Sequence, residues 1–73
     1  MIEVRLFATL RDGRGKVLQM DPAVISTAGD ILQKLEIPAE TVAILLINGF
    51  HSKPENPVQD GDVVSLFPPV GGG

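Results

Sequence analysis

Only one stretch of this 73-residue chain has a helical pattern of apolar residues. Ala28, Ile31, Leu32 and Leu35 fall at positions i, i+3, i+4 and i+7, which places them on one face of a short helix. The other apolar runs alternate or are bounded by turn residues, as strands are. A one-sided helix needs a sheet to cover its apolar face. The sequence therefore predicts an α+β domain in which one helix packs on a mixed, roughly four- to five-stranded sheet.

Strands are expected over residues 2–7, 16–20, 42–47 and 63–67. In the first of them Ile2, Val4 and Leu6 share one face, as in a half-buried strand. Asp12 and Gly13 then turn the chain into the second strand, because glycine accepts the positive φ of a tight turn. The same glycine-rich loop is followed by neither the Lys-Ser or Lys-Thr pair nor the helix start of a phosphate loop, so we interpret it as a turn.

The helix is expected to begin after Thr27, whose side chain can cap it while Asp30 reaches back to complete a capping box. Ser26 is a rival cap. Pro38 should stop the helix because proline lacks an N–H and restricts the preceding residue. Residues 53–57 contain two prolines and are predicted to form an irregular connection.

Composition excludes several classes of function. With no cysteine and 44% hydrophobic residues, stability has to come from core packing. A net charge of −3 and six scattered basic residues argue against nucleic acid as a partner. No apolar stretch is long enough for a membrane helix and the first residues lack a signal layout, so a cytoplasmic protein without a membrane partner is expected. One histidine and no cysteine, tyrosine or tryptophan make self-contained catalysis improbable, so we expect no enzyme.

The isolated polar residues have ordinary structural interpretations. His51 lies beside a turn with no second metal ligand in sight, so we interpret it as a solvated or structural side chain. Asp60 and Asp62 flank a glycine but lack the further acidic positions of a calcium loop, so they are interpreted as turn residues. No bound cofactor and no metal are expected.

The end of the chain is the strongest functional candidate. Pro68 and Pro69 should keep the exit from the last strand extended, so that residues 70–73 project from the domain. Six residues from Pro68 onward reach at most about 20 Å, which is enough to enter a partner's active site. Glycines pass through a narrow channel and leave a terminal carboxylate unobstructed. A solvated, inert end is the alternative.

A second candidate is the outer face of the sheet. The strands at 42–47 and 63–67 carry apolar residues on both faces, whereas one helix covers only one face. The outward residues either pack under the irregular connection or form an exposed docking patch beside the tail.

Five segments spread along the whole chain resemble motifs of a known protein family when they are taken together. They are Val4-Arg5-Leu6-Phe7-Ala8, Thr27-Ala28-Gly29-Asp30-Ile31-Leu32, Leu46-Ile47-Asn48-Gly49, Asp60-Gly61-Asp62-Val63-Val64 and Phe67-Pro68-Pro69-Val70-Gly71-Gly72-Gly73. Their order and spacing resemble the β-grasp, ubiquitin-like sulfur carriers, which include the small subunit of molybdopterin synthase and the thiamine-pathway sulfur carrier. The resemblance is closer to the molybdopterin branch. It implies a β-grasp domain over residues 1–67 and a flexible, extended tail over residues 68–73.

The resemblance also implies a chemical role for the tail. An E1-like enzyme would adenylate the carboxylate of Gly73 with ATP, and a sulfur donor would convert it to a thiocarboxylate. Gly71 and Gly72 would thread the tail into the partner, which is the large catalytic subunit of molybdopterin synthase or thiazole synthase. Docking would involve Phe67, Pro68, Pro69 and Val70. The protein would be a co-substrate rather than a catalyst.

Three functions therefore stay open at this point. The first is a sulfur carrier for molybdopterin or for the thiamine thiazole. The second is a ubiquitin-like modifier joined through Gly73 to lysines of other proteins. The third is an interaction module that uses the apolar sheet face and has an inert tail.

Overall fold

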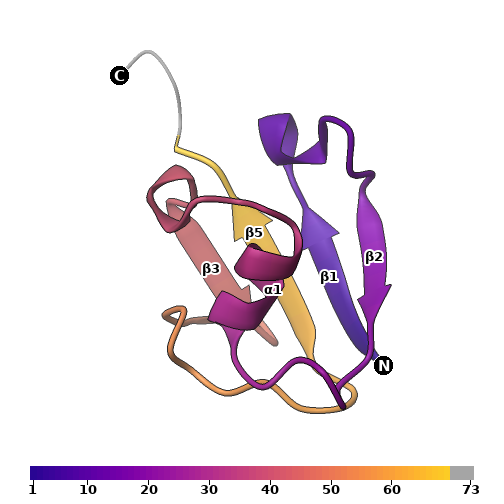
Figure 1. The fold of residues 1–73 in the computed structure, drawn as a ribbon. Helices are drawn as coiled ribbons and strands as arrows, with labels where there is room; N and C mark the ends of the chain where they lie inside the picture. The colour runs from indigo at the N-terminus through magenta and orange to yellow at the C-terminus, as the bar shows by residue number, and fades with distance from the viewer. Residues whose placement is uncertain (70–73) are drawn as a thin grey trace.

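A single mixed sheet in the order β2-β1-β5-β3-β4 carries the fold in the computed structural model, which describes residues 1–69 (Figure 1). The strands are β1 (Ile2–Leu6), β2 (Val17–Met20), β3 (Ile44–Ile47), β4 (Phe50–His51) and β5 (Val63–Phe67). β1 and β5 run parallel at the centre, and β2, β3 and β4 pair antiparallel with their neighbours. The predicted α+β class and mixed sheet are confirmed.

The short strand β4 was not among the predicted strands. Asn48 and Gly49 both have positive φ, 52° and 85°, as the two central residues of a tight hairpin require. The hairpin pairs Ile47 with Phe50 and extends the sheet by one edge strand. Two short 3-10 helices, η1 (Ala8–Arg11) and η2 (Ala39–Thr41), also lie in segments for which no element was predicted.

Helix α1 (Ala28–Lys34) begins where the sequence predicts. The Thr27 side chain accepts from the Asp30 backbone N–H, and the Asp30 carboxylate accepts from the Thr27 N–H, so the capping box is complete. Ser26 is not the cap. The backbone N–H groups of Ala28 and Gly29 donate to carbonyl groups of the connection between β4 and β5, which therefore closes over the first turn of the helix.

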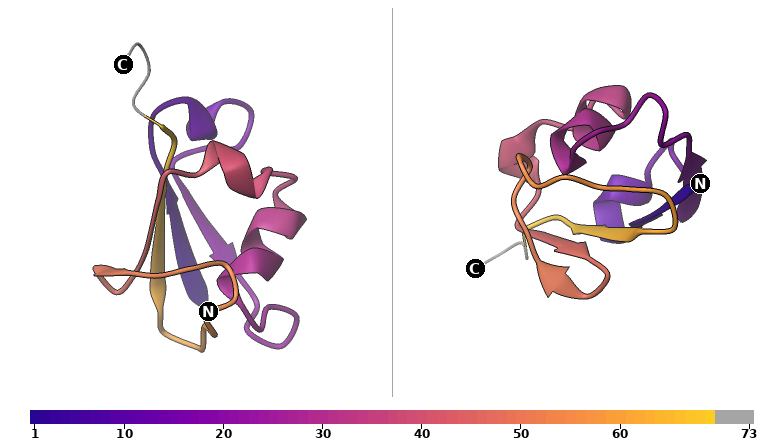
Figure 2. Two further views of the ribbon diagram at one scale, coloured as in Figure 1. Left: turned by 90° about the vertical axis from the view of Figure 1, so that its left-hand side faces the viewer. Right: turned by 90° about the horizontal axis from the view of Figure 1, so that it is seen from below.

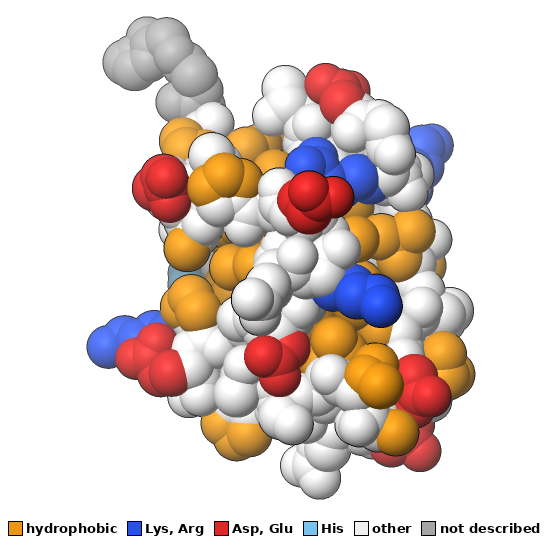
Figure 3. Space-filling view, in the orientation of Figure 1, with side chains coloured by type: hydrophobic (Ala, Val, Ile, Leu, Met, Phe, Trp, Pro, Cys, Tyr) orange, Lys and Arg blue, Asp and Glu red, His pale blue; other side chains and the backbone are white. Residues whose placement is uncertain are grey.

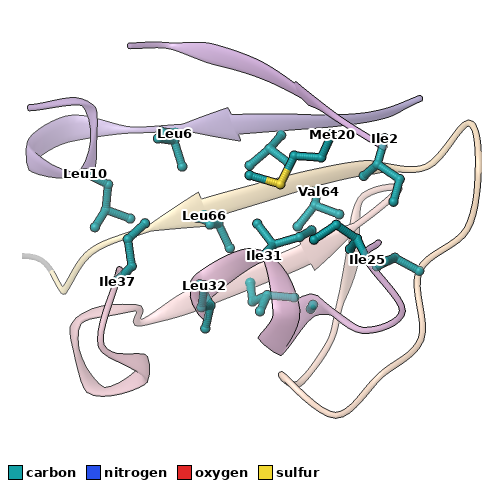
Figure 4. Close-up of a cluster of buried hydrophobic side chains, with 14 residues drawn as sticks. Ile2, Leu6, Leu10, Met20, Ile25, Ile31, Leu32, Ile37, Val64 and Leu66 are labelled. Carbon is teal, nitrogen blue, oxygen red and sulfur yellow. The ribbon is translucent and has the colours of Figure 1, made fainter. Parts of the chain in front are cut away.

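The core lies between α1 and one face of the sheet (Figure 4). The predicted inward residues of β1, Ile2, Val4 and Leu6, are fully buried. Ile31 and Leu32 of α1 pack against them, as the helical stripe predicts. The other buried hydrophobic residues are Leu10, Met20, Ile25, Ala28, Ile37, Leu45, Val58, Val64 and Leu66. Among the described residues no buried polar side chain interrupts this cluster.

The irregular connection after β4 lies on the same side of the sheet as α1 (Figure 2). Val58 is buried in the core, and an isolated bridge joins Pro57 to Thr27. The opposite face of β1, β5 and β3 is therefore left without a covering layer among the described residues.

Candidate functional site

The last strand is held on both sides up to its final residue. The Phe67 carbonyl accepts from the Ala43 N–H at 2.8 Å, and the Leu66 carbonyl accepts from the Phe7 N–H at 3.2 Å. Pro68 and Pro69 follow, and proline has no N–H with which to continue a ladder. The chain therefore leaves the sheet at Phe67, at the end of the sheet that also carries η1.

Two aromatic rings stack at this end of the sheet. Phe7 follows β1 and Phe67 ends β5, and because these strands are parallel and in register the two side chains lie beside each other. Their ring centroids are 4.2 Å apart with an interplanar angle of 9°. The guanidinium of Arg11 lies 5.3 Å from the centroid of the Phe7 ring, and its Nε donates to the Leu6 carbonyl at 2.8 Å. Cation–π contact and stacking together hold the base of the tail.

A shallow apolar groove surrounds this stack. Its lining comes from three parts of the chain: Phe7, Ala8, Thr9, Ile44, Phe67, Pro68 and Pro69. Ile44 pairs with Phe67 across the β3–β5 ladder and is 38% exposed. Ala8 has a φ of 53°, an unusual value for a residue with a side chain, where the chain turns from β1 into η1. We call these residues the tail-base groove.

The tail-base groove lies on the uncovered sheet face. Ile44 and Phe67 face outward there. Farther along the strands the outward positions are mixed, with Glu3, Arg5 and Ser65 beside the apolar Val63 and Leu46. The predicted exposed patch beside the tail is therefore present. The alternative, in which these residues pack under the irregular connection, is wrong, because that connection lies on the helix side.

The polar candidates have structural roles. Asp62 accepts from the Gln59 N–H at 2.9 Å and from the Asn48 side chain at 2.9 Å, so it ties the turn before β5 to the β3–β4 hairpin. The N-terminal ammonium of Met1 donates to Asp60 and lowers the pKa of that carboxyl below its usual value. His51 is exposed on β4. Within residues 1–69 no group of three His, Asp or Glu side chains gathers at metal-binding distance.

Of the predicted site residues, Phe67, Pro68 and Pro69 come together in the tail-base groove. Val70, Gly71, Gly72 and Gly73 lie outside the described residues. The sequence did not predict Phe7, Ile44 or Arg11 as part of the site. The available signal was that an aromatic residue ends both the first and the last strand pattern, which brings the rings together only if those strands are neighbours.

Comparisons with known proteins match this architecture. The chain fits the model of the ThiS family over residues 4–73. It is 33% identical to small archaeal modifier protein 3 of Haloferax volcanii, in an alignment that covers 99% of this chain and 98% of that protein.

Solved structures give the same result. The crystal structure of SAMP1 from Haloferax volcanii superposes with a TM-score of 0.77 at 26% identity, over 99% of this chain and 98% of that one. A chain of the complex of subunits 1 and 2 of molybdopterin-converting factor from Helicobacter pylori superposes with a TM-score of 0.63 at 27% identity, over 99% and 97% of the two chains.

One helix on a five-stranded mixed sheet with parallel central strands is the β-grasp architecture of ubiquitin-like proteins. The chain belongs to the ThiS family of ubiquitin-like sulfur carriers and small modifiers. The names of the similar proteins describe modifiers and a subunit of a larger assembly. Within residues 1–69, α1 is the longest helix, and it is far too short to span a bilayer.

Proposed function

We propose that this protein is a sulfur carrier that delivers sulfur from a thiocarboxylate on Gly73 in molybdopterin biosynthesis, as the small subunit of molybdopterin synthase. The observation that carries the proposal is the place where the last strand ends. The last strand ends at Phe67 inside an exposed apolar groove, and the family match continues through the glycines to residue 73. A partner that binds the groove receives the tail at the same time.

The chemistry requires activation of the carboxylate. An E1-like enzyme transfers AMP from ATP to the Gly73 carboxylate and releases pyrophosphate, because an ionised carboxylate is a poor electrophile. The terminal sulfur of a persulfide then attacks the carbonyl carbon and AMP leaves. A thiol cleaves the resulting S–S bond, forms a disulfide with the donor sulfur and releases the thiocarboxylate. In this cycle ATP is a substrate of the activating enzyme, and the carrier itself requires no cofactor.

Each part of the site has a role in this cycle. Phe67, Pro68, Pro69 and Val70 dock the base of the tail on the partner, and Gly71 and Gly72 let it pass through a narrow channel because they lack side chains. The large catalytic subunit of molybdopterin synthase is the proposed acceptor. The similarity to a chain of the Helicobacter pylori complex of subunits 1 and 2 of molybdopterin-converting factor supports this choice. A thiamine thiazole carrier would use the same thiocarboxylate with thiazole synthase as partner.

A ubiquitin-like modifier is the second candidate. The full-length similarity to small archaeal modifier protein 3 favours it. The same adenylate would then be attacked by the amine of a target lysine, with AMP as the leaving group and an isopeptide bond as the product. Both candidates need a free carboxylate on Gly73 and an E1-like enzyme, and they differ in the nucleophile.

The decisive experiment is thiol alkylation of the protein from its native cell extract, followed by mapping of the adduct by mass spectrometry. The chain has no cysteine, so an adduct on the C-terminal glycine identifies a thiocarboxylate. Intact mass alone is insufficient, because exchange of oxygen for sulfur adds nearly the same mass as oxidation of Met1 or Met20.

Three results are distinguishable in this experiment. An adduct on Gly73, absent from a variant that lacks Gly73, supports the carrier. Tail remnants on lysines of other proteins, without an adduct, support the modifier. A free carboxylate that persists after incubation with ATP, an E1-like enzyme and a sulfur donor refutes the carrier.

A further inference from the structure

The β3–β4 hairpin turns on an asparagine that is followed by a glycine. Asn48 and Gly49 have φ values of 52° and 85°, and both central positions of this tight turn require a positive φ. Asparagine is one of the few residues with a side chain that adopt this conformation routinely, and glycine adopts it without a steric cost. The geometry of the hairpin therefore favours this pair of residues.

An asparagine before a glycine is also chemically labile. The backbone nitrogen of the second residue attacks the side-chain carbonyl carbon of the first, and glycine hinders this attack least because it has no Cβ. Both Asn48 and Gly49 are exposed, and beyond the adjoining residues no atom lies within 4 Å of the position that a Cβ on Gly49 would take. Water and hydroxide therefore reach this turn from solvent.

The Asn48 side chain is held at both of its polar atoms in the folded chain. Its Nδ2 donates to Asp62 Oδ1 at 2.9 Å, and its Oδ1 accepts from the Val63 N–H at 2.9 Å. The backbone N–H of Asn48 donates to the Val63 carbonyl at 2.7 Å. These three bonds fasten the hairpin to the start of β5. Attack on the amide makes its carbon tetrahedral and expels Nδ2, so the reaction cannot proceed with both side-chain bonds intact.

We propose that Asn48 is a site of spontaneous deamidation, that its bonds to Asp62 and Val63 slow the reaction in the folded chain, and that the product loosens the hairpin from β5. Hydroxide removes the Gly49 N–H proton, the nitrogen attacks Asn48 Cγ, and ammonia leaves with a proton from water. A five-membered cyclic imide remains. Water then adds to either carbonyl carbon of the imide and breaks its C–N bond, which yields aspartate or isoaspartate. Nothing is oxidised or reduced.

The product disturbs the junction through its charge and its backbone. An aspartate at position 48 still accepts from the Val63 N–H, but it has no N–H for Asp62, so two carboxylates face each other where a hydrogen bond stood. Neither ion pair in the described part of the chain involves Asp62. The net charge is −3, and acidic and basic side chains are interspersed on the face that carries α1 (Figure 3), so no general excess of positive charge offsets the new one. Isoaspartate also lengthens the backbone within the turn.

The location separates this reaction from the tail. Asn48 contacts Val63, the first residue of β5, whereas the chain leaves the sheet after Phe67, the last residue of that strand. The inference does not depend on the chemistry at Gly73.

The test uses an internal control, because the only other asparagine cannot react in this way. Asn56 is followed by Pro57, whose nitrogen carries no proton and cannot form the imide. The full chain is incubated at mildly alkaline pH, folded and in urea, and conversion at each asparagine is measured by peptide mapping with detection of isoaspartate. Mapping is needed because the Asp-Gly pairs at residues 12–13 and 60–61 also form isoaspartate.

We expect conversion at Asn48 in both samples and none at Asn56. The rate at Asn48 should be about tenfold higher in urea, because the folded chain has to break two hydrogen bonds first, one of them to a charged group.

Matched variants test the role of Asp62. Asp62→Ala should speed conversion at Asn48 in the folded chain about fivefold, since it removes the acceptor of the Nδ2 bond. Asp60→Ala, in the same turn, does not touch Asn48 and should leave the rate unchanged. If Asp62→Ala does not fold, Asp62→Asn keeps the shape of the side chain without its charge and should speed conversion in the same direction.

The consequence of the reaction is tested with a variant that imitates the product. Asn48→Asp should speed hydrogen exchange of the amides of residues 48 and 63 about tenfold. Asn56→Asp is the control, because Asn56 uses only its Oδ1, which accepts from the Lys53 N–H and is kept by aspartate.

Four results would overturn the proposal. They are no conversion at Asn48 in urea, equal rates in the folded and unfolded chain, equal effects of the Asp60 and Asp62 substitutions, and unchanged amide exchange in Asn48→Asp.

Discussion

Replacement of Glu36 with glycine is expected to stabilise the fold. Helix α1 ends in a Schellman motif, in which the Ile37 N–H donates to the Leu32 carbonyl at 2.9 Å and the Glu36 N–H donates to the Gln33 carbonyl at 3.1 Å. This motif places Glu36 in the left-handed region with a φ of 56°. Glycine is the usual residue there because it has no Cβ to clash with the backbone.

The magnitude follows from opposing contributions. A residue with a Cβ costs about 1–2 kcal/mol in the left-handed conformation. Glycine loses more backbone entropy on folding, which offsets about 0.5–1 kcal/mol of that gain. Removal of a negative charge near the helix C-terminus adds about 0.3 kcal/mol. Glu36→Gly should therefore stabilise by about 1 kcal/mol, which corresponds to a rise in Tm of about 4–8 °C for a domain of this size.

The assay is urea and thermal unfolding of the unmodified chain, Glu36→Gly and Glu36→Ala under the same conditions. Alanine removes the charge but keeps the strained Cβ, so Glu36→Ala should change stability by less than about 0.5 kcal/mol. A Glu36→Gly variant that is no more stable than Glu36→Ala would refute the reasoning, because the left-handed backbone would then carry no cost that glycine relieves.

Three further predictions test the core, the site and the charges. Leu32→Ala should lower the free energy of unfolding by about 2–3 kcal/mol, the lower part of the usual range, because Leu32 also borders a surface groove that can relax. A loss below about 1 kcal/mol in urea unfolding would mean that the assigned buried face of α1 is wrong. Ile44→Thr should weaken binding to the large synthase subunit about fivefold in calorimetry. Val24→Thr, on the other side of the sheet, should leave this binding unchanged. Equal effects of the two substitutions would argue against the tail-base groove as the docking surface. Asp60→Asn should make Tm depend less on pH in the acid range. The folded-state pKa of Asp60 lies below the ordinary 3.8, so its contribution to stability is present above that value and is lost as the pH falls through the lowered pKa. Identical acid profiles at low salt would show that the contact with Met1 contributes nothing.

Local features of the fold were readable from the sequence because each depends on neighbouring residues. The alternation of Ile2, Val4 and Leu6 predicted which side of β1 is buried, and the spacing of Thr27 and Asp30 predicted the helix cap. The end of α1 was less accurate. The helix stops at Lys34 rather than running up to Pro38, because the Schellman motif ends it first at a residue that is not glycine.

The short strand β4 was missed because its two residues are followed by polar and proline-rich sequence. The turn that creates it consists of Asn48 and Gly49, which both have positive φ. Two residues give almost no alternation, and pairing with β3 alone makes Phe50–His51 a strand.

The glycine-rich end and its proposed chemistry come from the sequence alone, since the proposed reactive group is a terminal carboxylate and its neighbours are recognisable by type. Only the tertiary structure decided what surrounds the base of the tail. Phe7 and Phe67 stand near opposite ends of the chain, and they stack because β1 and β5 are parallel neighbours. The same pairing leaves β2 as an edge of the sheet, with an apolar groove beside it. Strand order depends on long-range pairing that local periodicity does not encode, so the stacked rings and the free β2 edge became visible only in the folded chain.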